Sequence, residues 1–196
     1  MERHEIAKHL DSFGEKIDKA VSEEILSTRC LFSNGNIEFF LKSMLFSYID
    51  FNLEKENHSY CMDKKINKHQ FDVIGFKDLE IAYTVETKCT IIHDVKGSIS
   101  AANKAKEQAL KNSQKYKHKD YPSRKSVNHY IIHFLMLESG ANSDFFPPAV
   151  RAKFPTQRPL AIARSKLSET YREIDKECGQ EIMVVKGKIS AFLAKV

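Results

Sequence analysis

The sequence predicts an α/β protein, and three observations lead to this class. Apolar residues recur at helical spacing in four segments, and β-branched and aromatic residues are concentrated in several shorter runs. One helical segment lies between two of these runs, which favours a mixed β-sheet with helices on its faces. The chain has 196 residues, which is enough for a single domain, residues 1–196, with its own hydrophobic core.

Composition and charge exclude several classes of protein. The chain is 42% hydrophobic and 29% charged with only 7 Gly and 5 Pro, so it is neither disordered nor fibrous. No apolar stretch approaches the roughly 20 residues of a membrane helix, so we expect no membrane association. The formal charge of +5 is compatible with a polyanionic partner. The widely spaced cysteines form no CxxC pair, which fits a reducing cytoplasm and indicates neither zinc nor disulfides; they are Cys30, Cys61, Cys89 and Cys178.

Two helices are expected before the first strand. Residues 1–30 repeat apolar residues at helical spacing and carry charges from the second position onward, so they form an amphipathic helix and not a signal peptide. The turn sequence SNGN (33–36) precedes a second helix, from Ile37 to about Tyr48. We expect residues 1–33 to be an N-terminal helical extension of a core formed by residues 34–138.

Three strands, a helix and a fourth strand are expected next. Residues 58–62, 69–76 and 80–92 are separated by polar turns and predict a three-stranded meander. Residues 98–116 predict a helix with a face of alanines, which lets a helix approach a sheet closely. The run VNHYIIHFLML (127–137) has the composition of a buried central strand.

The C-terminal part of the chain, residues 139–196, is expected to add a helix and a strand to this core. Four of the five prolines fall within residues 142–159, which predicts a loop or irregular segment. Residues 160–178 predict the last helix, and residues 181–186 predict the last strand.

Three charged residues stand inside the second and third predicted strands. Because side chains alternate along a strand, Glu86 and Lys88 point to the same face of the sheet. A turn centred on Asp78 places Asp72 opposite Thr84, with Glu86 as its diagonal neighbour at roughly 7–8 Å. Two carboxylates in this relation could share one metal ion, and Mg²⁺ suits a small set of oxygen ligands.

This combination of groups is suited to the hydrolysis of a phosphodiester bond. A Mg²⁺ ion, or Mn²⁺ in its place, can polarise a phosphoryl oxygen and generate hydroxide. The Lys88 ammonium can orient the attacking water or offset developing charge. The alternative interpretation is that Asp72, Glu86 and Lys88 form a cross-strand ion pair on an exposed face of the sheet.

The sequence here resembles the PD-(D/E)XK nuclease superfamily, whose signature is an aspartate on one strand and Glu-x-Lys on the next. Asp72 and Glu86-Thr87-Lys88 match this signature, whereas Phe71 stands at the position of the proline in the family name. The resemblance implies a restriction-endonuclease-like mixed β-sheet with an α-β-β-β-α-β core. It also implies that Asp72, Glu86 and the Thr87 carbonyl bind the metal, and that Lys88 acts at the attacking water.

The same resemblance implies further site residues on the two flanking helices. A glutamate on the helix before the sheet is matched by Glu38, which we expect to be an auxiliary catalytic carboxylate. A glutamine and a later tyrosine after Glu-x-Lys are matched by Gln108 and Tyr116, with Gln114 as an alternative to Gln108. The alternative for Glu38 is an i, i+4 ion pair with Lys42, and the alternative for Gln108 is a solvated helix face.

A basic run follows the helix with the alanine face. Residues 111–125 contain six basic residues against one acidic residue, Asp120, and tyrosines are interleaved among them. This composition is suited to contacts with the phosphate backbone of DNA, and the alternative is a solvated charged surface. The candidate DNA-binding residues in this run are Lys111, Lys115, Tyr116, Lys117, Lys119, Arg124 and Lys125.

We therefore expect a cytoplasmic, Mg²⁺-dependent deoxyribonuclease that acts as an endonuclease on DNA. The alternative is a non-catalytic nucleic-acid-binding or protein-interaction module with the same fold, since fold does not determine function. A homodimer would help so short a chain to cut both strands of a duplex. The sequence leaves open whether the substrate is duplex, single-stranded or branched DNA, or RNA.

Overall fold

The computed structural model describes residues 1–23, 37–53, 57–66, 68–91, 95–114, 122–136, 157–176, 181–186 and 189–196. Along these segments the elements are α1 (Arg3–Ser22), α3 (Ile37–Leu53), β1 (His58–Ile66), β2 (His69–Lys77), β3 (Glu80–Ile91), α4 (Val95–Ser113), β4 (Ser123–Met136), α6 (Gln157–Ile174), β5 (Glu181–Val185) and β6 (Ile189–Lys195). No helix in these segments is long and apolar enough to cross a membrane.

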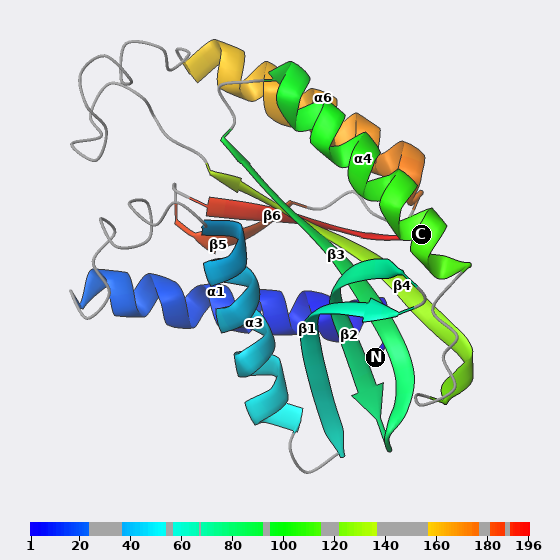
Figure 1. Ribbon diagram of the computed structural model, residues 1–196. Coiled ribbons are helices and arrows are strands. Elements are labelled where there is room, and N and C mark those ends of the chain that lie inside the picture. Colours follow the sequence, from blue (N-terminus) through cyan, green and yellow to red (C-terminus); the bar gives the residue numbers. More distant parts are fainter. Residues whose placement is uncertain are drawn as a thin grey trace.

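The strands form one six-stranded mixed sheet in the order β1-β2-β3-β4-β6-β5. Strands β3 and β4 are parallel, because α4 connects them, and the other neighbouring strands are antiparallel. Helices α1 and α3 pack on one face of the sheet, and α4 and α6 lie together on the other face (Figure 1). The α/β class predicted from the sequence is confirmed, with four helices in the described segments.

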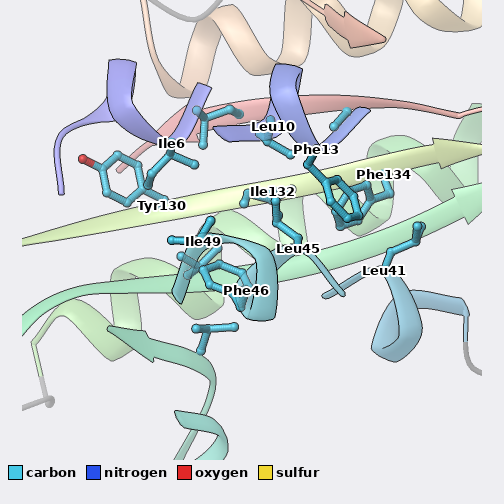
Figure 2. Close-up of a cluster of buried hydrophobic side chains, with 14 of the residues drawn as sticks. Ile6, Leu10, Phe13, Leu41, Leu45, Phe46, Ile49, Tyr130, Ile132 and Phe134 are labelled. Atoms are coloured by element: carbon cyan, nitrogen blue, oxygen red, sulfur yellow. The ribbon is translucent and has the colours of Figure 1, made fainter. Parts of the chain in front are cut away.

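The core on the face of α1 and α3 follows from helical periodicity. Four apolar side chains of α1 repeat every three or four residues and are buried, as expected for an amphipathic helix: Ile6, Leu10, Phe13 and Ile17. They meet apolar side chains of α3 and of the sheet in one cluster (Figure 2). The cluster includes Ile6, Leu10, Phe13, Ile17, Leu41, Leu45, Phe46, Ile49, Tyr130, Ile132 and Phe134.

The core on the opposite face is built around the alanines of α4. Ala102, Ala105 and Ala109 are buried against β4 and α6, which is the close approach that the alanine face predicts. Strand β4 supplies alternate residues to the two faces, with Ile131 and Leu135 on this side. The run 127–137 is therefore a buried central strand, flanked by β3 and β6, as expected.

The C-terminal part differs from the prediction by one strand. The predicted final strand is β5, and a further strand, β6, inserts between β4 and β5. Its residues from Ile189 to Ala194 are all buried, so the alternation that marks a half-exposed strand is missing from the sequence. The last helix, α6, begins at Gln157, three residues earlier than predicted. Most of the predicted loop 142–159 lies outside the described residues.

Candidate active site

The candidate site lies where β2 and β3 part. The two strands pair from the Lys77–Glu80 end as far as Val73 and Val85. Beyond that point β3 continues to Ile91 alongside β4, while the start of β2 pairs with β1. Beyond Val85, no described strand pairs with the edge of β3 that faces β2 in the first half of the strand.

Two acidic side chains occupy that edge of β3. Asp72 Oδ2 accepts the backbone N–H of Thr87 at 2.8 Å, and Glu38 Oε2 accepts the backbone N–H of Cys89 at 2.9 Å. The Thr87 hydroxyl lies between the two carboxylates, 3.2 Å from Asp72 Oδ2 and 3.3 Å from Glu38 Oε1. The acids therefore take the places of strand carbonyls, and the helix α3 delivers Glu38 to the same place as Asp72.

Glu38 faces the sheet and not the surface of its own helix. The alternative interpretation pairs it with Lys42, but the Lys42 ammonium is buried and lies 2.9 Å from Asp63 Oδ1 on β1. Burial raises the pKa of Glu38, and the nearby Lys88 opposes this shift. The ion pair between Lys42 and Asp63 ties α3 to β1 one turn after Glu38, which fixes the direction in which Glu38 points.

Glu86 lies on the other face of the sheet, toward α4. Its side chain is 1% exposed, and its Oε1 accepts a hydrogen bond of 2.5 Å from Asn112 Nδ2. Its second oxygen, Oε2, is buried and accepts no hydrogen bond from any described group. Burial raises the pKa of Glu86 to about 8, and Asp72 adds to this shift through its charge and through a hydrogen bond between the two carboxyl groups. An acidic group in this position favours either a proton or a bound cation.

Lys88 is the basic group of the site. Its ammonium donates a hydrogen bond of 2.7 Å to the Thr87 carbonyl and lies 3.8 Å from Asp72 Oδ2. The side chain is 22% exposed, so it is neither fully buried nor fully solvated. Among the described residues, the Lys88 ammonium is a positively charged group that lies close to the Asp72 carboxylate.

The strand register differs from the prediction in a way that brings the acids closer together. Thr84 stands opposite Ile74, not Asp72, and continuing the observed register places Asp72 directly opposite Glu86. Two features cause the difference. The turn holds two residues, Asp78 and Leu79, between the paired Lys77 and Glu80, and a β-bulge between Gly75 and Phe76 shifts the register by one more residue. Asp72 therefore lies nearer to Glu86 than the diagonal relation predicts, and the two carboxyl groups interact with each other.

The oxygen atoms of this site fit a hard cation such as Mg²⁺, which takes one or two carboxylates and keeps several waters. Asp72 and Glu86 supply the carboxylates, and the buried Glu86 Oε2 atom has a vacant hydrogen-bonding capacity. The Thr87 carbonyl has a second lone pair besides the one that Lys88 uses. Within the described segments, His, Cys, Asp and Glu side chains form no group of three or more arranged to hold a metal ion.

Asn112 is the site residue that sequence reasoning missed. It is 2% exposed and donates to Glu86 Oε1 and, at 3.1 Å, to the Gln70 carbonyl. The signal was present, because Asn112 follows Ala109 at helical spacing and so continues the buried alanine face. A polar residue on such a face needs a buried partner.

Few of the predicted DNA-binding residues lie in described segments. Gln108 is half-buried one turn before Asn112, and Lys111 is exposed in the last turn of α4. The structure does not bring either side chain to the acidic site. Arg124 and Lys125 belong to β4, but only their backbones are among the described parts of the chain. Four further candidates lie wholly outside the described residues: Lys115, Tyr116, Lys117 and Lys119.

Comparison of the chain with protein-family models, with curated proteins and with solved structures finds no match.

Proposed function

We propose that this protein is a metal-dependent deoxyribonuclease that hydrolyses phosphodiester bonds within DNA. One observation carries the proposal. Asp72, Glu86 and Lys88 come together where β2 and β3 part, with a buried carboxylate oxygen that accepts no hydrogen bond from the described residues. An ion pair made for stability alone does not require two carboxyl groups held so close together that the pKa of one of them is raised.

The order of elements supports a restriction-endonuclease-like fold for the core. Helix α3, strands β1 to β3, helix α4 and strand β4 follow one another as α-β-β-β-α-β, which is the order that the resemblance implies. The mixed sheet with helices on both faces is compatible with it. We extend the proposal to this fold, to action in the cytoplasm, and to a homodimer that cuts both strands of a duplex.

The residues that would hold Mg²⁺ or Mn²⁺ are Asp72 and Glu86, with the Thr87 carbonyl as an additional ligand. A bound ion of this kind polarises a phosphoryl oxygen and lowers the pKa of a coordinated water. Asn112 fixes the orientation of Glu86 through its 2.5 Å hydrogen bond. The β3 backbone fixes Asp72 through the N–H of Thr87.

Lys88 is the group best placed to contact the scissile phosphate or the attacking water. Its ammonium has three donors, of which the structure assigns one to the Thr87 carbonyl. The remaining donors can orient water or bind a non-bridging phosphoryl oxygen as negative charge develops. Glu38 lies on the far side of the Thr87 hydroxyl from Asp72, where it can accept a proton from a water near the site.

The test compares three near-isosteric or truncated variants with the wild-type protein. Asp72→Asn, Glu86→Gln and Lys88→Ala are assayed for nicking of supercoiled plasmid with Mg²⁺ or Mn²⁺, beside calorimetric titration of the metal. The matched control is Glu107→Gln, which removes an exposed acid on α4. We expect the two acid variants to lose both metal binding and cleavage, and Lys88→Ala to lose cleavage while it still binds metal.

The expected loss in the acid variants is about 100-fold or more, since a metal contributes several kcal/mol and roughly 1.4 kcal/mol corresponds to tenfold in rate. The control should cleave at the wild-type rate. Cleavage that survives Glu86→Gln would contradict the proposed mechanism.

A second candidate function is a non-catalytic nucleic-acid-binding or protein-interaction module. The observation that favours it is the use of Asp72 and Glu38 as hydrogen-bond acceptors for the β3 edge, which gives both acids a structural role. In that case neither Mg²⁺ nor Mn²⁺ would bind, and the wild-type protein would leave every DNA substrate intact. Glu38→Gln, which keeps an acceptor for Cys89 N–H, would then change nothing measurable.

A further inference from the structure

We propose that the β1–β2 hairpin grips the sugar-phosphate backbone of the substrate beside the acidic site, through Lys64, Lys65 and Lys68. This inference rests on the proposed nuclease function and names the surface that binds the nucleic acid. The three lysines are exposed and lie within five residues of one another at the end of the hairpin. None of them belongs to the basic run 111–125.

Pairing and packing hold the described residues on both sides of the hairpin turn. Lys65 stands opposite Gln70, and Ile66 stands opposite His69. Lys68 adopts a left-handed backbone conformation with φ of 68°, as a tight hairpin turn requires. Beneath the lysines, Ile66 and the neighbouring Phe71 are buried in a small apolar cluster with Ile74 and Ile81. The hairpin end that carries the lysines is therefore supported by buried apolar side chains.

The described residues of the hairpin carry more positive than negative charge. The acids are Asp63 and Asp72, and each of them lies near a lysine from outside the hairpin: Asp63 is 2.9 Å from the buried Lys42 ammonium, and Asp72 is 3.8 Å from the Lys88 ammonium. Positive charges clustered in this way are the electrostatic footprint of a polyanion-binding surface.

Asn112 couples the hairpin to the acidic site. A single amide nitrogen of Asn112 donates to the Gln70 carbonyl at 3.1 Å and to Glu86 Oε1 at 2.5 Å. The strand residue next to Lys65 is thus held by the group that orients Glu86. At roughly 3.3 Å per strand residue, Lys68 lies about 13 Å from Asp72 along β2, the rise of about four nucleotides.

The position of the hairpin reduces the electrostatic repulsion between the acidic site and a phosphate backbone. Glu38 and Asp72 lie on either side of the Thr87 hydroxyl, and a phosphate backbone that approaches these two acids is repelled. Lysines on the adjoining hairpin offset this repulsion and set the distance of the strand from the acids. Contacts to phosphates in such a position fix the register of the nucleic acid and carry no sequence preference.

The experiment measures binding separately from cleavage. A fluorescent duplex and a single strand of the same sequence are titrated with the full-length Asp72→Asn protein, with and without Lys64→Gln, Lys65→Gln and Lys68→Gln together. Fluorescence anisotropy gives Kd at several salt concentrations from about 50 to 300 mM, the range over which phosphate contacts weaken strongly.

A matched control removes three lysines at the opposite edge of the sheet. The control lysines are exposed and belong to this edge: Lys19, Lys166 and Lys186. Lys186 directly follows β5, and its N–H donates to Asp18, the neighbour of Lys19. Arg164, two residues before Lys166, donates to Glu181 of β5. Changing all three to glutamine alters the net charge by the same amount. Thermal unfolding of each variant verifies that the fold is retained.

We expect the hairpin variant to bind more weakly and to lose up to about 0.9 in the slope of log K against log salt per contact on duplex, or about 0.7 on single strand. The control should keep the wild-type slope. If the hairpin variant keeps its slope, or the control loses as much, the inference is overturned while wild-type cleavage leaves the proposed function standing. If wild-type protein neither binds nor cleaves DNA or RNA, both proposals fail.

Discussion

The Asp72 carboxylate accepts the backbone N–H of Thr87 at 2.8 Å, at the point where β3 leaves its neighbour β2. A buried N–H at this point would otherwise be left without the carbonyl of a paired strand. Asp72 therefore has two separable properties, an acceptor oxygen that serves the fold and a negative charge that serves the proposed chemistry. The same separation applies to Glu38 and the N–H of Cys89.

Substitutions at Asp72 should separate these two properties. Asp72→Asn keeps an acceptor for Thr87 and removes a charge that the neighbouring acids repel and that Lys88 attracts. Because these two effects oppose each other, the free energy of unfolding should stay close to that of wild type. Asp72→Ala leaves the N–H of buried Thr87 unpaired and should cost about 1–3 kcal/mol. Urea unfolding followed by circular dichroism measures both. Equal stability of the two variants would show that the hydrogen bond does not support the edge.

Removing the Asn112 amide should affect both the fold and the proposed activity. Asn112→Ala leaves Glu86 Oε1 and the Gln70 carbonyl without their donor, at a cost of about 1–3 kcal/mol in unfolding free energy. It also frees the orientation of Glu86, so half-maximal cleavage should require about 10–100-fold more Mg²⁺. Asn103→Ala, which removes an exposed amide on the same helix, is the control and should match wild type in both measurements.

Gly75 is required by the ring of Tyr83 on the neighbouring strand. A Cβ added at Gly75 would lie 2.0 Å from a ring carbon of Tyr83, which is fully buried. Gly75→Ala should therefore destabilise the protein by about 1–3 kcal/mol, as overpacking does. In a Tyr83→Leu background the same change should cost clearly less. An additive double-mutant cycle from chemical denaturation would contradict this account.

Acid should destabilise the protein through the buried His133. Burial, assisted by the positive charge of Lys88, lowers the pKa of His133 from 6.5 to about 3, and its ring nitrogens face the hydroxyls of Thr90 and Tyr171. Below pH 6.5 the unfolded chain takes up a proton that the folded chain refuses, so stability falls as pH falls toward about 3. The loss should reach roughly 3 kcal/mol by pH 4, at 1.36 kcal/mol per pKa unit.

The measurement is the free energy of urea unfolding at several pH values from about 7 to 4, for wild type and His133→Gln. Glutamine keeps polar atoms near both hydroxyls but does not titrate, so the variant should show a shallower decline with acid. A decline as steep as that of wild type would assign the acid sensitivity to other groups. The buried His129, whose pKa burial lowers to about 4, contributes the same sign in both proteins.

Much of the fold follows from periodicity that is local in the sequence. The apolar repeats of α1 and α3, the alanine face of α4 and the β-rich runs of β2, β3 and β4 each specify one element, because each must bury one face or one stripe. The helix between β3 and β4 likewise determines that these two strands run parallel. Strand β6 was missed because its residues from Ile189 to Ala194 are all buried, so its sequence lacks the alternation of a half-exposed strand.

The candidate site was only partly determined by the sequence. The identities and spacing of Asp72, Glu86 and Lys88 sufficed to nominate them, because alternation along one strand is a local property. The tertiary structure decided how these residues meet. The two-residue turn and the bulge beside Gly75 together shift the register of β2 against β3, and helix α3 turns Glu38 toward Thr87. It also decided that Asn112 reaches Glu86. These relations depend on how separate elements pack against one another. Residues far apart in the sequence then come into contact, and local spacing does not predict such contacts.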